Sequence, residues 1–210
     1  MVKINRPPLP AGIHITSETD YRSEPVHGIL AAIFHGKCYI CESKSTTIHV
    51  EHRVHHAGNP TIKYDWNNLF LSCGHCNQIK SIQYDDILDP ATVDPEDYIT
   101  LEFYHVDNAV VVEKTNEKNG VDSTVSLLQH VYHNDKTPTK RLECRNLREQ
   151  IGNVLASFLT LLDACLNESN SIGKSQLLAD ELSRKGEFAA FKRHIVRSNP
   201  VKYAALQQYL

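Results

Sequence analysis

The fold is decided by two short stretches, Cys38-Tyr39-Ile40-Cys41 and Cys73-Gly74-His75-Cys76, each of which places two cysteines three positions apart. Two such pairs brought together supply the four thiolates of a closed tetrahedral zinc site. The alternative is that one pair is redox-active or merely buried. Zinc is favoured because four of the six cysteines and six of the twelve histidines lie between His35 and Cys76. We therefore predict a structural Zn²⁺ bound to Cys38, Cys41, Cys73 and Cys76.

The segment between the two cysteine pairs has the pattern of a β-hairpin. Residues 46–54 alternate apolar and polar side chains, and residues 69–72 form a short apolar run, so each predicts a strand. The intervening Ala57-Gly58-Asn59-Pro60 indicates a turn. From Gly74 to about Gln83 we expect a helix.

A wider pattern surrounds the cysteines. An acidic residue followed by histidine, Glu51-His52, stands in the first predicted strand, and Asn68-Leu69 comes five residues before the second cysteine pair. Asn77 follows that pair directly, and Lys80 comes three residues later. This arrangement resembles that of HNH nucleases with a ββα-metal fold, over residues 35–85.

The resemblance implies a role for each matching residue. His52 would be the general base that activates water, and Glu51 and Asn77 would bind a catalytic divalent metal. Asn68 would tie the hairpin together and hold the base in place. The third position is Asn77 rather than histidine, and because an amide oxygen suits a hard cation, Mg²⁺ is the expected metal. Lys80 and Arg53 are candidate contacts to substrate phosphates.

The same residues suit phosphodiester hydrolysis on chemical grounds alone, independently of the family resemblance. Phosphodiester cleavage needs an in-line nucleophile, a base with a pKa near neutral and a cation that stabilises the developing charge. A histidine and one oxygen-ligated metal meet these needs. One geometric difficulty remains, because adjacent residues of a regular strand point to opposite faces. Glu51 and His52 can therefore address one site only if the strand ends or twists there.

The neighbouring side chains each have a plainer interpretation. We expect His49, His55 and His56 to be exposed polar residues of the hairpin, with substrate or metal contact as the alternative. His75 is expected to be exposed, and Trp66 to be a packing anchor rather than a platform for base stacking. Lys80 is either a phosphate contact or simply exposed.

The rest of the chain predicts an α+β protein. Residues 99–104 and 109–113 form a second expected hairpin, whereas 124–133 and 138–167 carry apolar residues at helical spacing. Shorter helices are expected at 174–184, 188–196 and 202–209. The predicted organisation is an extended N-terminal arm (1–26), a zinc-stapled ββα-metal nuclease core (27–98), a β-hairpin connector (99–122) and a helical region for partner docking (123–210).

Charge and hydropathy restrict the partners. The net charge is −3, whereas a protein that grips nucleic acid alone usually has a basic surface. Two cationic helix faces are candidates for local contacts, Arg141, Arg145 and Arg148 on one and Lys192, Arg193 and Arg197 on the other, although a solvated face is the default. No run approaches the roughly 20 apolar residues of a membrane helix, so we expect a cytoplasmic protein without a membrane partner.

A closer resemblance extends beyond the core. It rests on Ile4-Asn5-Arg6-Pro7, the stretch from Trp66 to Cys73, Asp89-Pro90 and Asp94-Pro95-Glu96. These residues resemble the retron-associated and Septu-type HNH nucleases, often called PtuB. The resemblance implies anti-phage defence with an ABC or SMC-like ATPase partner (PtuA-like), and a retron reverse transcriptase with its nucleic acid as further partners.

Two rival functions stay open. The first is a non-catalytic zinc-ribbon module that binds nucleic acid or protein and needs no Glu51-His52-Asn77 set. The second keeps the nuclease but takes a structured host RNA rather than DNA, because nothing in the core motif distinguishes the 2′-hydroxyl.

Overall fold

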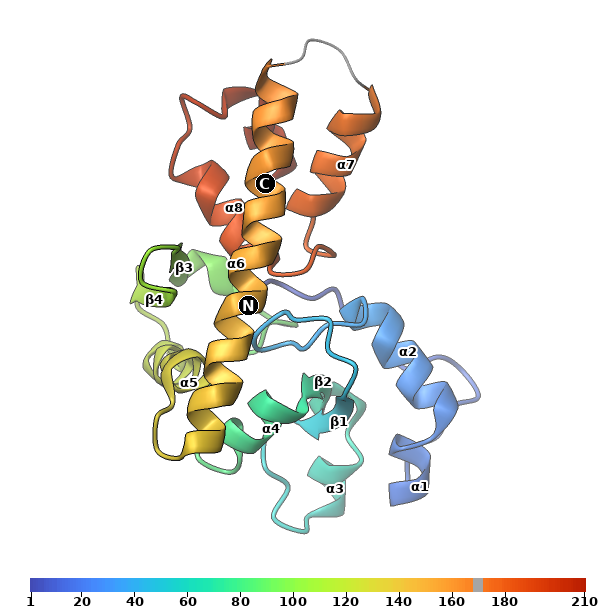
Figure 1. Ribbon diagram of the computed structural model, residues 1–210. Coiled ribbons are helices and arrows are strands. Elements are labelled where there is room, and N and C mark those ends of the chain that lie inside the picture. The colour runs from blue at the N-terminus through green and yellow to red at the C-terminus, as the bar shows by residue number, and fades with distance from the viewer. Residues whose placement is uncertain (168–171) are drawn as a thin grey trace.

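The computed structural model describes residues 1–167 and 172–210 and shows an α+β fold with two antiparallel hairpins and a mainly helical C-terminal half (Figure 1). Residues 168–171, which belong to the predicted helical region, lie outside the described residues. The strands are β1 (Ile48–His52), β2 (Leu69–Cys73), β3 (Ile99–Tyr104) and β4 (Ala109–Lys114). The α-helices are α1 (Glu18–Tyr21), α2 (Glu24–Phe34), α3 (Pro60–Lys63), α4 (Gly74–Lys80), α5 (Val121–His133), α6 (Pro138–Asn167), α7 (Ile172–Leu182) and α8 (Ala189–Arg197). Three 3-10 turns complete the chain, η1 (Trp66–Asn68), η2 (Pro95–Asp97) and η3 (Ala204–Tyr209).

The first hairpin and the helix after it form a ββα unit. Strands β1 and β2 pair so that Ile48 faces Cys73 and His52 faces Leu69. All five residues of β2 are buried, and the ring of Phe70 packs against aromatic side chains from α2 and the first cysteine loop. The helix α4 follows β2 without a loop. The predicted strands and helix are confirmed, although α4 ends at Lys80.

The N-terminal residues, predicted to form an extended arm, are part of the core. Met1, Val2 and Ile4 are each at most 9% exposed. The backbone N–H of Ile4 donates to the Pro90 carbonyl at 2.8 Å. Helix α2 begins at Glu24, because Pro25 fits the first helical turn, where its missing N–H costs nothing. The predicted boundary after residue 26 therefore falls inside a helix.

Trp66 joins this N-terminal segment to the ββα unit. Its side chain is 7% exposed, and its indole N–H donates to the Pro7 carbonyl at 3.1 Å. The Arg6 guanidinium lies over the Trp66 ring, 5.1 Å from its centroid, and donates to the Trp66 carbonyl at 2.7 Å. The expectation that Trp66 is a packing anchor is confirmed.

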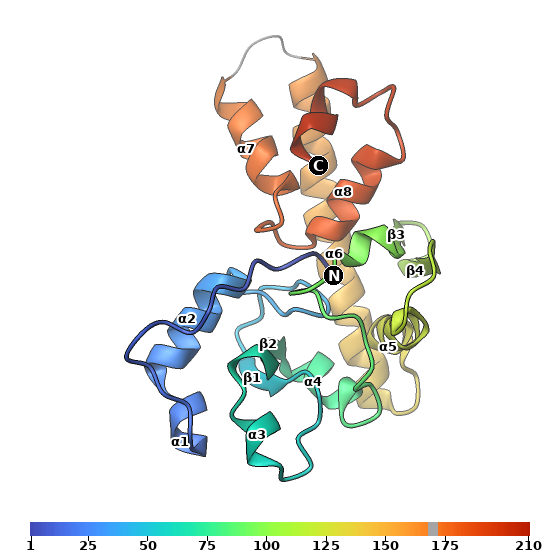
Figure 2. The ribbon, with the colours of Figure 1, turned by 180° about the vertical axis from the view of Figure 1, so that it is seen from behind.

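Helix α6 runs along the length of the C-terminal half (Figure 1). Its N-terminal and central turns contribute Leu147, Ile151 and Leu155 to the main core. Phe158 and Leu162, nearer its C-terminal end, pack into a separate cluster with α7, α8 and η3. Figure 2 shows the β3–β4 hairpin with α8 on one side and α5 on the other. Although α6 has 30 residues, no helix in the described part of the chain is both long and apolar enough to cross a membrane.

The two predicted cationic faces are largely occupied by internal contacts. Arg148 donates to the carbonyls of Asn108 and Tyr132, so only Arg141 and Arg145 of the first face are exposed. On α8 the expectation of a solvated face is wrong. Lys192 is 1% exposed and pairs with Glu181, whereas Arg193 and Arg197 both pair with Glu96. Lys192 and Arg193 are buried because α8 packs between the β3–β4 hairpin and α6, whereas Arg197 remains exposed.

Candidate functional site: a four-cysteine cluster beside a histidine–carboxylate pair

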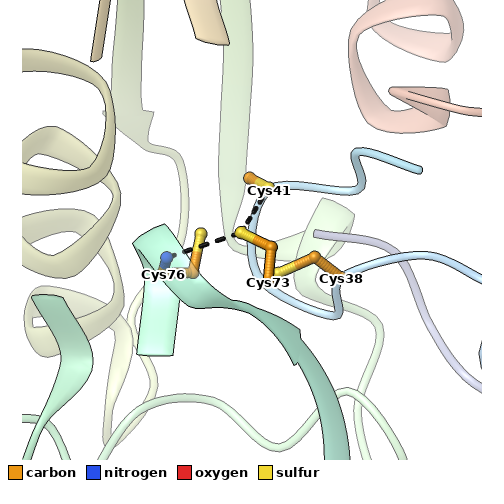
Figure 3. Close-up of side chains that lie close together, drawn as sticks. All are labelled: Cys38, Cys41, Cys73 and Cys76. Atoms are coloured by element: carbon orange, nitrogen blue, oxygen red, sulfur yellow. Dashed lines mark hydrogen bonds between the residues drawn. The ribbon is translucent and has the colours of Figure 1, made fainter. Parts of the chain in front are cut away.

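The four predicted zinc ligands come together in one buried cluster (Figure 3). Cys38 and Cys41 stand in the loop after α2, whereas Cys73 ends β2 and Cys76 lies in the first turn of α4. The Cys73 sulfur caps α4 by accepting the Cys76 N–H at 3.4 Å. The hairpin, the helix and the preceding loop are thus joined at one point.

The sulfur positions match the needs of a tetrahedral metal. The four sulfur atoms lie within 4.8 Å of one another, and those of Cys41 and Cys73 are 3.8 Å apart. A Zn–S bond of about 2.3 Å requires sulfur–sulfur separations of about 3.8 Å. Although burial raises the pKa of the Cys38 thiol, hydrogen bonds from the other three cysteines lower it well below its ordinary value. The cluster is consistent with a structural Zn²⁺ site.

Glu51 points from β1 toward the C-terminal end of α4. Its carboxylate is 2.9 Å from the ammonium of Lys80, and both side chains are almost fully buried. The second carboxylate oxygen, Oε2, is buried without a hydrogen-bond partner among residues 1–167 and 172–210. Burial raises the pKa of Glu51 to about 7, although Lys80 opposes that shift. The carboxylate therefore has one paired and one free oxygen.

His52 points away from Glu51, into the loop between β1 and β2. Its Nε2 lies 2.8 Å from the Lys63 carbonyl, and since a carbonyl only accepts, Nε2 must carry the proton. Nδ1 then holds the free lone pair. The ring packs edge-on against Tyr21 and His56, at 5.2 and 4.7 Å between centroids. Burial lowers the pKa of His52, which favours the neutral ring.

Asn68 fastens the loop that holds His52. Its side-chain oxygen accepts the Val54 N–H at 2.8 Å, and its amide nitrogen donates to the carbonyls of Val54 at 2.9 Å and Ile62 at 3.1 Å. Ile62 directly precedes Lys63, whose carbonyl fixes the His52 ring. The predicted tying residue therefore makes bonds of the expected kind.

Asn68→Ala is expected to destabilise the fold by about 2–3 kcal/mol, because it removes three hydrogen bonds and leaves loop groups unsatisfied. Chemical denaturation of the zinc-loaded protein measures this loss. Asn67→Ala is the matched control, since Asn67 is the exposed neighbour and its side chain makes no hydrogen bond in the described residues. Equal stability of the two variants would contradict the role given to Asn68.

Asn77 lies one turn before Lys80 on α4. With His27 from α2 and His49 from β1, it lines a hollow of about 540 Å³. No hydrogen bond in the described part of the chain joins the side chains of Glu51, His52 and Asn77. All three belong to one ββα unit, but Glu51 and His52 diverge because successive residues of a strand alternate.

The two candidate phosphate contacts are engaged within the protein. Lys80 is 1% exposed and, besides Glu51, bonds the His52 carbonyl at 3.2 Å. The sequence allowed Lys80 to be either exposed or a contact to substrate phosphate, and in the structure it is neither. Arg53 donates to the Ile87 carbonyl at 3.2 Å, and its Nε lies 3.6 Å from Asp89. Both cations hold the hairpin to the chain that follows α4.

His75 is not the exposed residue expected between two cysteines. Its ring lies 3.0 Å from a Glu143 oxygen and 2.8 Å from the Val131 carbonyl. Although burial lowers the pKa of His75, these hydrogen bonds and one from Cys144 raise it to about 9. His75 links the cysteine cluster to α5 and α6. Its position at the start of a helix gave no sign of partners 56 and 68 residues away.

Comparisons with models of known protein families, with curated proteins and with solved structures gave no match.

Proposed function

We propose that the chain is a metal-dependent HNH endonuclease that hydrolyses phosphodiester bonds, with a ββα-metal core formed by β1, β2 and α4. The observation that carries the proposal is the single tautomer of His52. The Lys63 carbonyl accepts from Nε2 and leaves Nδ1 as a free base, at the strand end where the HNH resemblance places one. A non-catalytic zinc ribbon has no need of a histidine held in this way.

Two metals have different parts in the proposal. Zinc on the four buried cysteines is structural, because a closed set of four sulfurs leaves no open coordination position. Glu51 and Asn77 would hold Mg²⁺, and the free oxygen of Glu51 fits that part, since carboxylate and amide oxygens are hard ligands. When bound, Mg²⁺ stabilises negative charge on the phosphate and the leaving oxygen.

The protein's own residues account for the proton transfer. His52 Nδ1 takes a proton from water as the water oxygen bonds to phosphorus. The bond from phosphorus to the 3′-oxygen then breaks, the 3′-oxygen takes up a proton from solvent water, and His52 returns its own proton to solvent. The products are a 5′-phosphate and a 3′-hydroxyl. Asn68 holds the 54–62 segment of the loop, and the Lys63 carbonyl accepts from the Nε2 proton in both the neutral and the protonated ring.

Glu51→Gln and Asn77→Ala are each expected to lower Mg²⁺-dependent cleavage by at least about 100-fold, the upper end of the loss when a residue that merely supports a metal ligand is changed. Titration calorimetry with Mn²⁺ gives a readout independent of cleavage and should show weakened binding. Gln83→Ala, an exposed residue beyond α4, is the control. Unchanged Mn²⁺ affinity in both variants would contradict this metal assignment.

The biological setting follows from the PtuB resemblance and the charge. A chain of net charge −3 should bind its substrate weakly alone, because affinity for nucleic acid comes largely from cations that replace phosphate counterions. We therefore propose an anti-phage defence nuclease that acts with an ABC or SMC-like ATPase, with a retron reverse transcriptase and its nucleic acid as further partners. The docking surface proposed is the exposed part of α6 around Arg141 and Arg145, since Met1, Val2 and Ile4 anchor the start of the N-terminal segment in the core.

One experiment tests both activity and substrate. The chain is incubated with Mg²⁺ and either DNA or total cellular RNA, with and without the co-encoded ATPase, and the products are sequenced. Cleavage of DNA supports the proposal as stated, and cleavage of RNA alone supports the structured-RNA alternative. No cleavage of either, with zinc and the ATPase present, favours the non-catalytic module.

A further inference from the structure

A large hollow lies between the N-terminal residues, the end of α2 and the loop that joins α7 to α8, with a volume of about 950 Å³. In Figure 2 the first residues of the chain run beneath that loop toward α2. None of Glu51, His52 and Asn77 lines it. The hollow is therefore separate from the proposed catalytic residues.

The lining of the hollow is strongly cationic. Six of its side chains are lysine or arginine and one is acidic: Lys3, Arg6, Lys37, Arg184, Lys185 and Arg193, against Glu42. Glu42 is already neutralised, since it lies 3.6 Å from the Lys37 ammonium and 2.9 Å from the Met1 amino group. Arg184 is likewise paired with Asp94, and Arg193 with Glu96. The cations of the lining that have no ion pair in the described residues are Lys3, Arg6 and Lys185.

Two of the guanidinium groups keep donors that the protein does not satisfy. Arg193 is 2% exposed and bonds Glu96 and the Leu182 carbonyl, yet its Nη2 is buried without a partner in the described residues. The Nε of Arg6 is in the same state. Buried donors without an acceptor cost free energy, so an acceptor ligand at this position would stabilise the protein.

The rim of the hollow has unpaired lysine side chains next to apolar side chains. Lys3 and Lys185 are exposed, and neither makes an ion pair within residues 1–167 and 172–210. Burial lowers the pKa of His35, and the charges of Lys37 and two other lysines, one of them Lys185, lower it further, which indicates a positive field. The half-exposed side chains of Ile33 and Tyr209 also line the hollow.

We propose that this hollow binds a phosphate ester, with the phosphate between Lys3, Lys185 and the unsatisfied N–H of Arg193. Arginine and lysine together suit phosphate oxygens, and a sugar or base fits against Ile33 and Tyr209. An acidic peptide would pair with the lysine and arginine side chains but would leave the apolar surface of Ile33 and Tyr209 without a partner. The backbone of a nucleic acid and a free nucleotide share this chemistry. The inference goes beyond the proposed catalysis and does not depend on cleavage.

The test measures binding without cutting. Full-length His52→Ala protein, without added Mg²⁺, is titrated into a fluorescein-labelled 20-nucleotide single strand at several salt concentrations. Lys3→Glu/Lys185→Glu should weaken binding at least tenfold. It should also reduce the slope of log affinity against log salt by about 1.4, since each phosphate contact contributes about 0.7 for a single strand. Both lysines are exposed and unpaired, so thermal stability should stay unchanged.

Lys118→Glu/Lys202→Glu is the matched control, because it makes the same charge change at two exposed lysines outside the hollow. It should alter affinity for the strand less than twofold.

Competition experiments identify the ligand. Displacement of the strand by ATP or inorganic phosphate supports the site and identifies a free nucleotide or phosphate as a ligand. Displacement only by unlabelled oligonucleotide supports a nucleic-acid backbone. Three results would each overturn the proposal. The first is equal weakening of strand binding by both double variants, and the second is no binding of any phosphate probe. The third is displacement of the strand by poly-glutamate as effectively as by oligonucleotide. None of these results bears on whether the protein cuts nucleic acid.

Discussion

Cys73→Ser is expected to yield a chain without bound zinc that does not fold at 37 °C. Cys73 ends β2, caps α4 and contributes one of the four clustered sulfurs. Structural zinc sites contribute about 10–16 kcal/mol of binding free energy in small zinc peptides, which is comparable to the roughly 5–15 kcal/mol that stabilises an ordinary domain. Loss of one ligand should therefore remove most of the stability of the N-terminal half. Metal analysis and circular dichroism of the purified chain measure both effects.

The control for this prediction is Cys165→Ser. Cys165 is half-buried in α6 and lies outside the cluster, so its replacement should leave one zinc per chain and a nearly unchanged melting temperature. Chelation of zinc from the wild type should reproduce the effect of Cys73→Ser. Soluble, folded wild-type protein with no zinc would contradict the structural assignment of the cluster.

The secondary structure was largely predictable from local patterns. Helix α6 has the bounds that the apolar spacing predicted, 138–167, and β3 and β4 form the hairpin expected at 99–104 and 109–113. Each of these features depends on residues close together in the sequence. The N-terminal arm was the main error, because proline indicates an absence of helix and says nothing of burial. The packing of Arg6 and Trp66 on each other joins segments 60 residues apart.

The sequence predicted which residues belong to the candidate site, but it did not predict which of their side chains contact one another. The two cysteine pairs predicted the cluster, since few other structures need four thiols at that spacing. Nothing local predicted that Lys80 would be buried against Glu51, or that His75 would reach α5 and α6. Such contacts are set by tertiary packing. The sequence placed Glu51 and His52 in one site and raised strand alternation as a geometric difficulty, and in the structure the two side chains do point apart.

His52→Ala is expected to lower cleavage by about 10²–10⁴-fold, the usual contribution of a general base. The side chain is half-buried at the end of β1 and lies outside the four-cysteine cluster, so zinc content should stay at one per chain. Loss of the ring also removes its bond to Lys63 and its packing on Tyr21, so a small loss of stability is expected. His105→Ala, an exposed histidine beyond β3, is the control and should cut like the wild type.

The most direct test of the nuclease assignment is a cleavage assay with Mg²⁺, in which wild-type and His52→Ala proteins of equal zinc content are compared and the product ends are mapped. The proposal predicts internal cuts with 5′-phosphate and 3′-hydroxyl ends from the wild type, in the presence of the proposed ATPase partner, and almost none from the variant. Equal cutting by the two proteins, or no cutting by the zinc-loaded wild type with the proposed partner, would contradict it.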